Sequence, residues 1–166
     1  MKNENFEVII EISENSSAVK YEIDKKTGLL SVDRMLKTSM HYPCNYGFIS
    51  NTLSEDNDPC DALVISSNPI LPNASVLCRA VGVLMMEDEA GNDEKIICTP
   101  IKKIDPFYDF INDINDINKH TLRRIKHFFE HYKDIDDDKW VKVKSWGNAE
   151  NAYQMINDAF KRALSK

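Results

Sequence analysis

The spacing of apolar residues changes late in this chain, and that change most limits the folds available to it. Earlier, apolar and polar residues alternate over short stretches, as in residues 6–13, where Val8, Ile10 and Ile12 share one face of a predicted strand. After residue 120 the apolar residues recur at helical spacing. Short strands followed by helices predict a mainly β, α+β fold: a five-stranded OB-like closed barrel with extra strands and two C-terminal helices. We expect a single domain over residues 1–166.

The other elements follow from the same patterns. Further strands are predicted at 20–24, 29–34, 62–66, 75–86, 95–99 and 140–144, the first two joined in a hairpin by the turn 25–28. Pro43 and Gly47 interrupt the aromatic stretch 41–49, where we expect a rigid loop. The first predicted helix carries Leu122, Ile125, Phe128, Phe129 and Tyr132 on one face. Asn148 is expected to cap the second, whose buried stripe includes Ala152, Ile156, Phe160 and Leu164.

Composition excludes several classes of protein. Apolar residues make up 42% of the chain and the formal net charge is −6, which argues against a nucleic-acid or anionic-membrane surface. No apolar run reaches membrane-spanning length, and the polar N-terminus, Met1 to Phe6, does not fit a signal peptide. The cysteines are widely spaced and form no CxxC pair: Cys44, Cys60, Cys78 and Cys98. They predict reduced thiols and a cytoplasmic location.

The segment Asp56-Asn57-Asp58-Pro59-Cys60-Asp61 holds three carboxylates within six residues. Pro59 disfavours a helical conformation at Asp58, so we expect a rigid, extended loop. Close carboxylates repel one another unless a cation neutralises them, and oxygen ligands suit hard ions such as Mg²⁺. The alternative is a solvated Asp-rich turn. An EF-hand is excluded, because the positions that need Gly and Glu hold Asp61 and Ser67.

A second acidic set lies in a predicted hairpin between residues 86 and 95. A turn at Gly91-Asn92 is expected to bring Asp88 and Asp93 together. Counting Glu11 and Glu22, the candidate set has seven acids against four bases, which are Lys20, Arg34, Lys95 and Lys133. This combined charge of −3 would repel an anion, whereas two Mg²⁺ ions would make it +1. The arithmetic points to a metal-dependent site for a small, highly charged anion such as phosphate. No Walker or kinase-type glycine loop is present to require a nucleotide.

Two pairs of residues allow structural explanations as well. Tyr42 and Tyr46 either pack as aromatics or present hydroxyls to a phosphate. His127 and His131 are four apart on a predicted helix and can chelate a metal only with a third ligand, so surface or partner contacts are favoured.

Several stretches together closely resemble the family I (soluble) inorganic pyrophosphatases of bacterial type, over nearly the whole chain from about Glu11. They are Lys20-Tyr21-Glu22-Ile23-Asp24-Lys25, Val32-Asp33-Arg34, Tyr42-Pro43-Cys44-Asn45-Tyr46-Gly47, the Asp56–Asp61 loop, Met86 to Asp93, Lys95 and His131-Tyr132-Lys133. Ser13 and Cys60 depart from the family pattern, which has Pro and an aliphatic residue there. Cys60 places a thiol in the acidic loop.

The resemblance implies Mg²⁺-dependent hydrolysis of pyrophosphate to two phosphates. Asp58 would be the general base, and Asp56, Asp61, Asp88 and Asp93 would bind metal. The phosphates would be held by Lys20, Arg34, Tyr46, Tyr132, Lys133 and Lys95, with Glu11 and Glu22 nearby. A homohexamer is implied for bacterial relatives.

Two rival interpretations remain at this point. The first is an OB-barrel module that binds single-stranded nucleic acid without enzymatic activity, which needs a basic groove. The second is a calcium-binding structural protein, which does not need Lys20, Arg34 and Lys133 directed at the same site.

Overall fold

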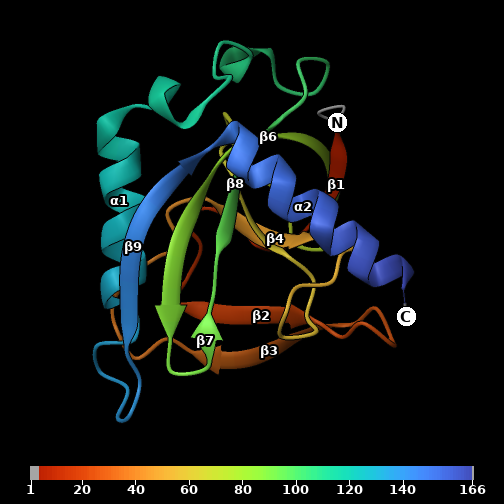
Figure 1. The fold of residues 1–166 in the computed structure, drawn as a ribbon. Helices are drawn as coiled ribbons and strands as arrows, with labels where there is room; N and C mark the ends of the chain where they lie inside the picture. The colour runs from red at the N-terminus through yellow and green to blue at the C-terminus, as the bar shows by residue number, and fades with distance from the viewer. Residues whose placement is uncertain (1–3, 166) are drawn as a thin grey trace.

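The computed structural model of the chain describes residues 4–165 and is shown in Figure 1; residues 1–3 of the polar N-terminus and residue 166 lie outside the described part. The strands are β1 (Phe6–Ile12), β2 (Val19–Ile23), β3 (Leu30–Met35), β4 (Asn45–Ile49), β5 (Asp61–Val64), β6 (Ser75–Asp88), β7 (Gly91–Asn92), β8 (Lys95–Pro100) and β9 (Val141–Asn148). The helices are α1 (Lys119–His131) and α2 (Ala149–Leu164), with 3-10 turns at Pro106–Tyr108 and Ile114–Asp116. All predicted strands and both predicted helices are present.

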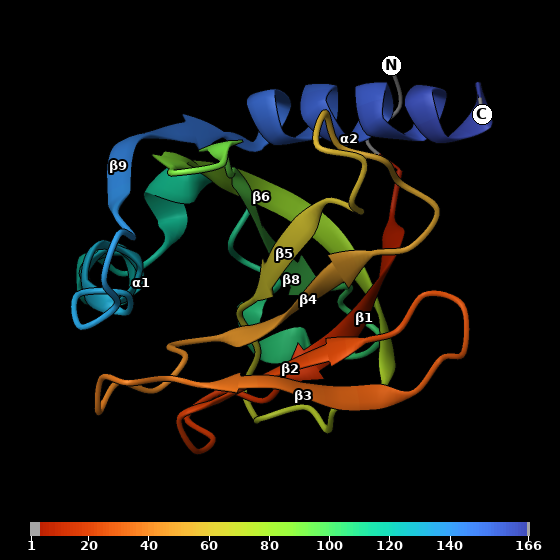
Figure 2. The same cartoon turned by 90° about the horizontal axis from the view of Figure 1, so that it is seen from below.

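The strands form one large, mainly antiparallel sheet and a separate hairpin. The order in the large sheet is β1-β4-β5-β8-β6, and β6 also pairs with β1. Among these pairs, β5 and β8 run parallel. β7 and β9 both pair with β6, and β2 pairs with β3. Figure 2 shows α2 along one side of these strands and α1 beside β9. The chain is therefore mostly β sheet with two helices.

β4 is a strand that the sequence pattern did not predict, since residues 41–49 were expected to form a loop. It pairs with β1 and β5, with Gly47 opposite Ile10. A Cβ atom on Gly47 would lie 1.9 Å from the carbonyl oxygen of Ile9. Gly47 therefore allows two strands to approach closely and does not break the strand.

The two helices cover different apolar clusters. α1 buries Ile125, Phe128 and Phe129, as predicted. Asn148 caps α2 through its side chain, which accepts a hydrogen bond from the backbone N–H of Asn151 at 2.9 Å.

The buried stripe of α2 differs from the prediction. Ala152 and Ile156 are buried, but Ala159 continues the stripe and Leu164 is 89% exposed. The last turn of the helix extends past the sheet, so Leu164 has no apolar surface to cover. Within residues 4–165, no helix is long and apolar enough to cross a membrane.

Candidate active site

One cleft of about 360 Å³ collects every residue that the sequence singled out as a site residue. Its lining includes Glu11, Lys20, Glu22, Arg34, Tyr46, Asp56, Asp58, Asp61, Asp88, Asp93, Lys95, Tyr132 and Lys133. These residues come from β1, the β2–β3 hairpin, β4, the acidic loop, the β6–β8 connection and the end of α1. Residues far apart in the chain therefore meet at this cleft. Figure 1 shows two of the contributing parts, the β2–β3 hairpin and the turn from β6 to β7, at the lower part of the view.

The acidic loop is a tight turn and not the extended segment that we expected. Asn57 has a φ of 73°, and the Asp56 carboxylate accepts a hydrogen bond from the backbone N–H of Asp58 at 3.0 Å. The backbone N–H of Ser54 donates to the carbonyl of Asp58 at 2.7 Å. The turn leaves Asp58 exposed, and it places Asp61 at the first position of β5.

The second acidic hairpin also turns at a different place. Asp88 pairs with Gly91, so the turn residues are Glu89 and Ala90, while Gly91 and Asn92 form β7. Gly91 has a φ of 126°, which a side chain rarely tolerates. The hairpin still brings Asp88 close enough for its charge to raise the pKa of Asp93.

Lys95, at the start of β8, lies at the centre of the carboxylates. It is 3% exposed, and its ammonium group contacts both Asp61 and Asp93. Burial alone would lower the pKa of Lys95, but the negative charges of Asp61 and Asp93 raise it above its ordinary value. For Asp93, burial raises the pKa, the charge of Lys95 lowers it and the charge of Asp61 raises it. Lys95 therefore stays protonated at neutral pH between two acids.

Lys133 forms a second buried ion pair just beyond α1. Its Nζ atom lies 2.7 Å from Asp88 Oδ2 and 3.5 Å from Glu89 Oε1. Burial alone would raise the pKa of Asp88, but hydrogen bonds from Lys133 and the backbone N–H of Ala90 lower it. Asp88 is therefore ionised at neutral pH, and its side chain is held in one orientation.

Glu11 on β1 secures the edge of the β2–β3 hairpin. The Glu11 side chain is buried and accepts a hydrogen bond from the backbone N–H of Ile23 at 2.8 Å, with Lys25 Nζ at 3.4 Å. Burial raises the pKa of Glu11. This contact holds β2 against β1, and with it the two site residues of β2.

The hairpin presents a row of charges to the cleft. Lys20 contacts Glu22 on the same strand and lies 3.4 Å from Asp33 Oδ2. Arg34 is paired with Lys20 across the hairpin, and its guanidinium lies 3.4 Å from the same Asp33 oxygen. Asp33 thus holds two cations side by side.

Three tyrosines line the deeper wall. Burial raises the pKa values of Tyr42, Tyr46 and Tyr132 above the ordinary value for tyrosine. Their hydroxyls remain neutral donors at physiological pH. Tyr42 also packs against Phe128 with ring centroids 4.6 Å apart, so it combines a structural contact with a position in the lining.

The cleft contains ionisable residues that the sequence did not single out: Lys25, Glu89 and Lys139. They bring the lining to eight acids and six bases, a formal charge of −2 instead of the −3 expected. Lys25 and Glu89 lie within or next to the matched motifs, so the motifs were the available signal. Lys139 precedes β9, and nothing in its local sequence distinguishes it from a surface lysine.

The donor chemistry of the cleft suits a hard divalent cation. Asp56, Asp61, Asp88 and Asp93 offer carboxylate oxygens on two facing elements, and the ligand atoms are all oxygen. Lys95 and Lys133 hold three of these four acids in place. Between residues 4 and 165, no three acid, imidazole or thiol side chains already converge as a ligand group. The oxygen donors therefore fit a hard cation by their chemistry, while in this arrangement three of the carboxylates pair with ammonium groups.

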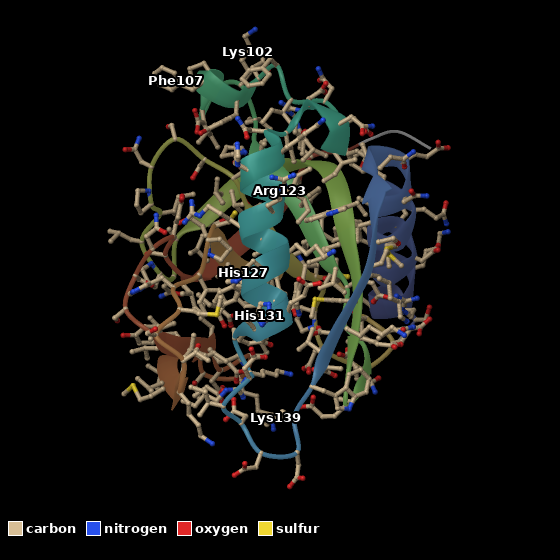
Figure 3. The ribbon with its side chains drawn as sticks, turned by 90° about the vertical axis from the view of Figure 1, so that its left-hand side faces the viewer. Lys102, Phe107, Arg123, His127, His131 and Lys139 are labelled. Atoms are coloured by element: carbon tan, nitrogen blue, oxygen red, sulfur yellow. The ribbon has the colours of Figure 1, made fainter. Side chains whose placement is uncertain are left out.

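His127 and His131 lie outside the cleft on the outer face of α1, as Figure 3 shows. Their rings are in contact at a tilt of 47°, with centroids 4.6 Å apart, and His131 Nδ1 lies 2.8 Å from Asp134 Oδ2. His131 therefore has a surface contact of the kind that its sequence position predicted.

Cys60 does not line the cleft but lies next to it. Its Sγ atom lies 3.2 Å from Ser54 Oγ, and burial raises the pKa of its thiol. Together with Arg162 of α2, Cys60 lines a second cavity of about 400 Å³, which shares Asp56, Asp61 and Asp93 with the cleft.

A family model, sequence relatives and a solved structure all match this chain to the same family. A family model described as "Inorganic pyrophosphatase" matches residues 8–164. The inorganic pyrophosphatase of Rickettsia typhi is 52% identical, covering 99% of this chain and 92% of that protein. That of Xylella fastidiosa is 52% identical over 96% of this chain and 89% of its own length. The solved structure of the Helicobacter pylori inorganic pyrophosphatase superposes with a TM-score of 0.95 at 50% identity, covering 98% of this chain and 95% of that one.

Proposed function

The chain belongs to the inorganic pyrophosphatase family and hydrolyses inorganic pyrophosphate to two phosphates, and we propose that it does so with Mg²⁺. The observation that supports this most strongly is a single cleft in which buried lysines separate carboxylates from one another. A formal charge of −2 cannot by itself attract a pyrophosphate anion. Added divalent cations reverse that balance, which explains why so many acids surround an anion site.

In this proposal Asp56, Asp61, Asp88 and Asp93 would hold the metal ions. When bound, paired divalent ions neutralise phosphate charge and lower the pKa of an attacking water. Asp58 accepts the proton of that water at its carboxylate. Asp58 is exposed to solvent, and the hydrogen bond from its backbone N–H to the Asp56 carboxylate fixes its position.

The basic residues and tyrosines hold the phosphates. Lys20 and Arg34 come from the β2–β3 hairpin and Lys133 from the segment after α1, so one phosphate can be contacted from two different elements. Tyr46 and Tyr132 donate hydrogen bonds from neutral O–H groups, since burial keeps these hydroxyls protonated. Lys95 neutralises charge deep in the site. Phosphoryl transfer needs positioning and charge neutralisation more than covalent chemistry, and these groups supply both.

The finer features of the fold belong to the same proposal. The pairing of β6 with β1 supports a closed five-stranded OB-like barrel, because it returns the strand order to its beginning. The family match over residues 8–164 supports one domain. The family resemblance supports a cytoplasmic homohexamer.

Phosphate release from pyrophosphate, measured with Mg²⁺ and then with excess EDTA, tests the metal requirement. We expect activity to fall to near background on chelation and to return when Mg²⁺ is restored. Undiminished turnover in EDTA contradicts the proposal. A nucleic-acid-binding module would need a basic groove, and no observation favours it, since the cleft has a formal charge of −2.

A further inference from the structure

An ion pair outside the cleft joins two elements that both contribute to it. Lys37 follows β3, which carries Arg34, and Asp136 lies in the segment 133–139 that follows α1. Lys37 Nζ lies 3.0 Å from Asp136 Oδ1. Beside this pair, the hydroxyl of Thr38 donates to the backbone carbonyl of Tyr132 at 3.5 Å. Figure 3 shows the segment with Lys139 next to the hairpin, at the same end of the molecule.

Asp136 is held both by Lys37 and by its own segment. The Asp136 side chain is only 16% exposed, and its backbone N–H donates to the carbonyl of Lys133 at 2.9 Å. The hydrogen bond from Lys37 lowers the pKa of Asp136 most, and the charges of Lys37, Lys139 and Arg34 lower it further. Arg34 and Lys139 line the cleft, whereas Lys37 and Asp136 do not. The Asp136 carboxylate is therefore fixed where the end of β3 meets the segment 133–139.

We propose that Asp136 is a positioning residue. Its ion pair with Lys37 holds the end of β3, which carries Arg34, against the segment 133–139, which carries Lys139, so that both cations stay at the cleft. Ordering the elements and side chains of a site costs free energy on binding. Joining the two elements lowers that cost before the substrate arrives. This inference rests on the phosphate-binding role proposed above for Arg34.

The direction of the effect separates positioning from simple electrostatics. Asp136 is an anion near a site for an anion. If only its charge mattered, its removal would strengthen pyrophosphate binding and lower KM. If it positions Arg34 and Lys139, its removal raises KM while the chemical step is unchanged.

The test compares KM and kcat for Asp136→Ala, Lys37→Ala and the double variant at saturating Mg²⁺. We expect KM to rise about three- to fivefold in Asp136→Ala, the range of a partly exposed ion pair, with kcat within about twofold of wild type. The double variant is expected to match Asp136→Ala, because Lys37 acts through Asp136. Asp136→Glu keeps the charge and is expected to restore most of the affinity.

Lys126→Ala and Glu130→Gln are matched controls. Lys126 is 49% exposed and lies 3.6 Å from Glu130 on the outer face of α1, so KM should stay at the wild-type value. An unchanged or lower KM in Asp136→Ala overturns the inference, and so does a loss of kcat that tracks a lower unfolding midpoint. Arg34→Ala separates a failure of the proposed function from a failure of this inference. A wild-type KM in Arg34→Ala refutes the phosphate-binding role of Arg34. A raised KM in Arg34→Ala together with a wild-type KM in Asp136→Ala refutes only the positioning role of Asp136.

Discussion

Replacing Lys95 with methionine should destabilise the protein in a way that a divalent cation repairs. Lys95→Met keeps the length of the side chain but leaves Asp61 and Asp93 facing each other without the ammonium group. Removing one partner of a buried ion pair costs about 3–5 kcal/mol. The two carboxylates are 28% and 23% exposed, so the lower end applies, about 3 kcal/mol. For a chain of this size that lowers the unfolding midpoint by about 6–12 °C.

The assay is thermal unfolding of wild type and Lys95→Met in EDTA, in Mg²⁺ and at falling pH. Mg²⁺ should narrow the difference in unfolding midpoint between wild type and Lys95→Met, since the variant binds a cation without competition from Lys95. Burial raises the pKa of Asp93, so its folded form takes up a proton more readily than its unfolded form. The repulsion in the variant is therefore present at neutral pH and relieved as the pH falls through that pKa.

Lys142→Met is the matched control, because Lys142 is 70% exposed and lies 3.9 Å from Glu87. We expect the free energy of unfolding of Lys142→Met to differ from that of wild type by less than about 1 kcal/mol. If Lys95→Met is as stable as wild type in EDTA, or if Mg²⁺ widens the gap, the interpretation of Lys95 as the cation between two acids is wrong.

Two further predictions concern other parts of the cleft. Lys133→Ala should lower kcat/KM by about 10- to 150-fold, since a charge-assisted contact is worth about 1.5–3 kcal/mol. The loss should exceed that of Arg34→Ala, because the Lys133 side chain is 8% exposed and that of Arg34 is 33% exposed. Equal losses of kcat/KM in the two variants, or no loss, would contradict this prediction. Burial raises the pKa of Glu11, so its contribution to stability is present at low pH and lost as the pH rises through its folded pKa. In denaturant unfolding, the stability of Glu11→Gln should then rise relative to that of wild type as the pH rises above the ordinary glutamate pKa of 4.5, and parallel curves would refute the assignment.

The sequence predicted the order of strands and helices because alternation and helical spacing are local properties. It missed β4 because Gly47 resembles a break until the facing backbone of Ile9 is known. It placed Leu164 in the buried stripe of α2 because periodicity does not show where the sheet beneath a helix ends. Both errors concern packing between distant segments.

The site residues were predictable because they lie in short motifs, and the structure brings all of them to one cleft. Lys139 and Asp136 were not predictable, because each lies in an ordinary charged segment. Their relation to Arg34 arises only when the end of β3 and the segment after α1 come together. The turn at Asn57 likewise depends on a side-chain contact from Asp56 that composition does not specify.

Mg²⁺ titration calorimetry combined with pH–rate profiles of Asp58→Asn and Asp61→Asn tests whether the acids of one loop have different roles. Asp61→Asn should lose Mg²⁺ affinity together with activity. Asp58→Asn should keep most of its Mg²⁺ affinity, lose about 10²–10⁴-fold in the chemical step and recover part of it at high pH, where water ionises without help. Equal losses of Mg²⁺ affinity in both variants, with no recovery at high pH, would mean that Asp58 is a metal ligand and not the base.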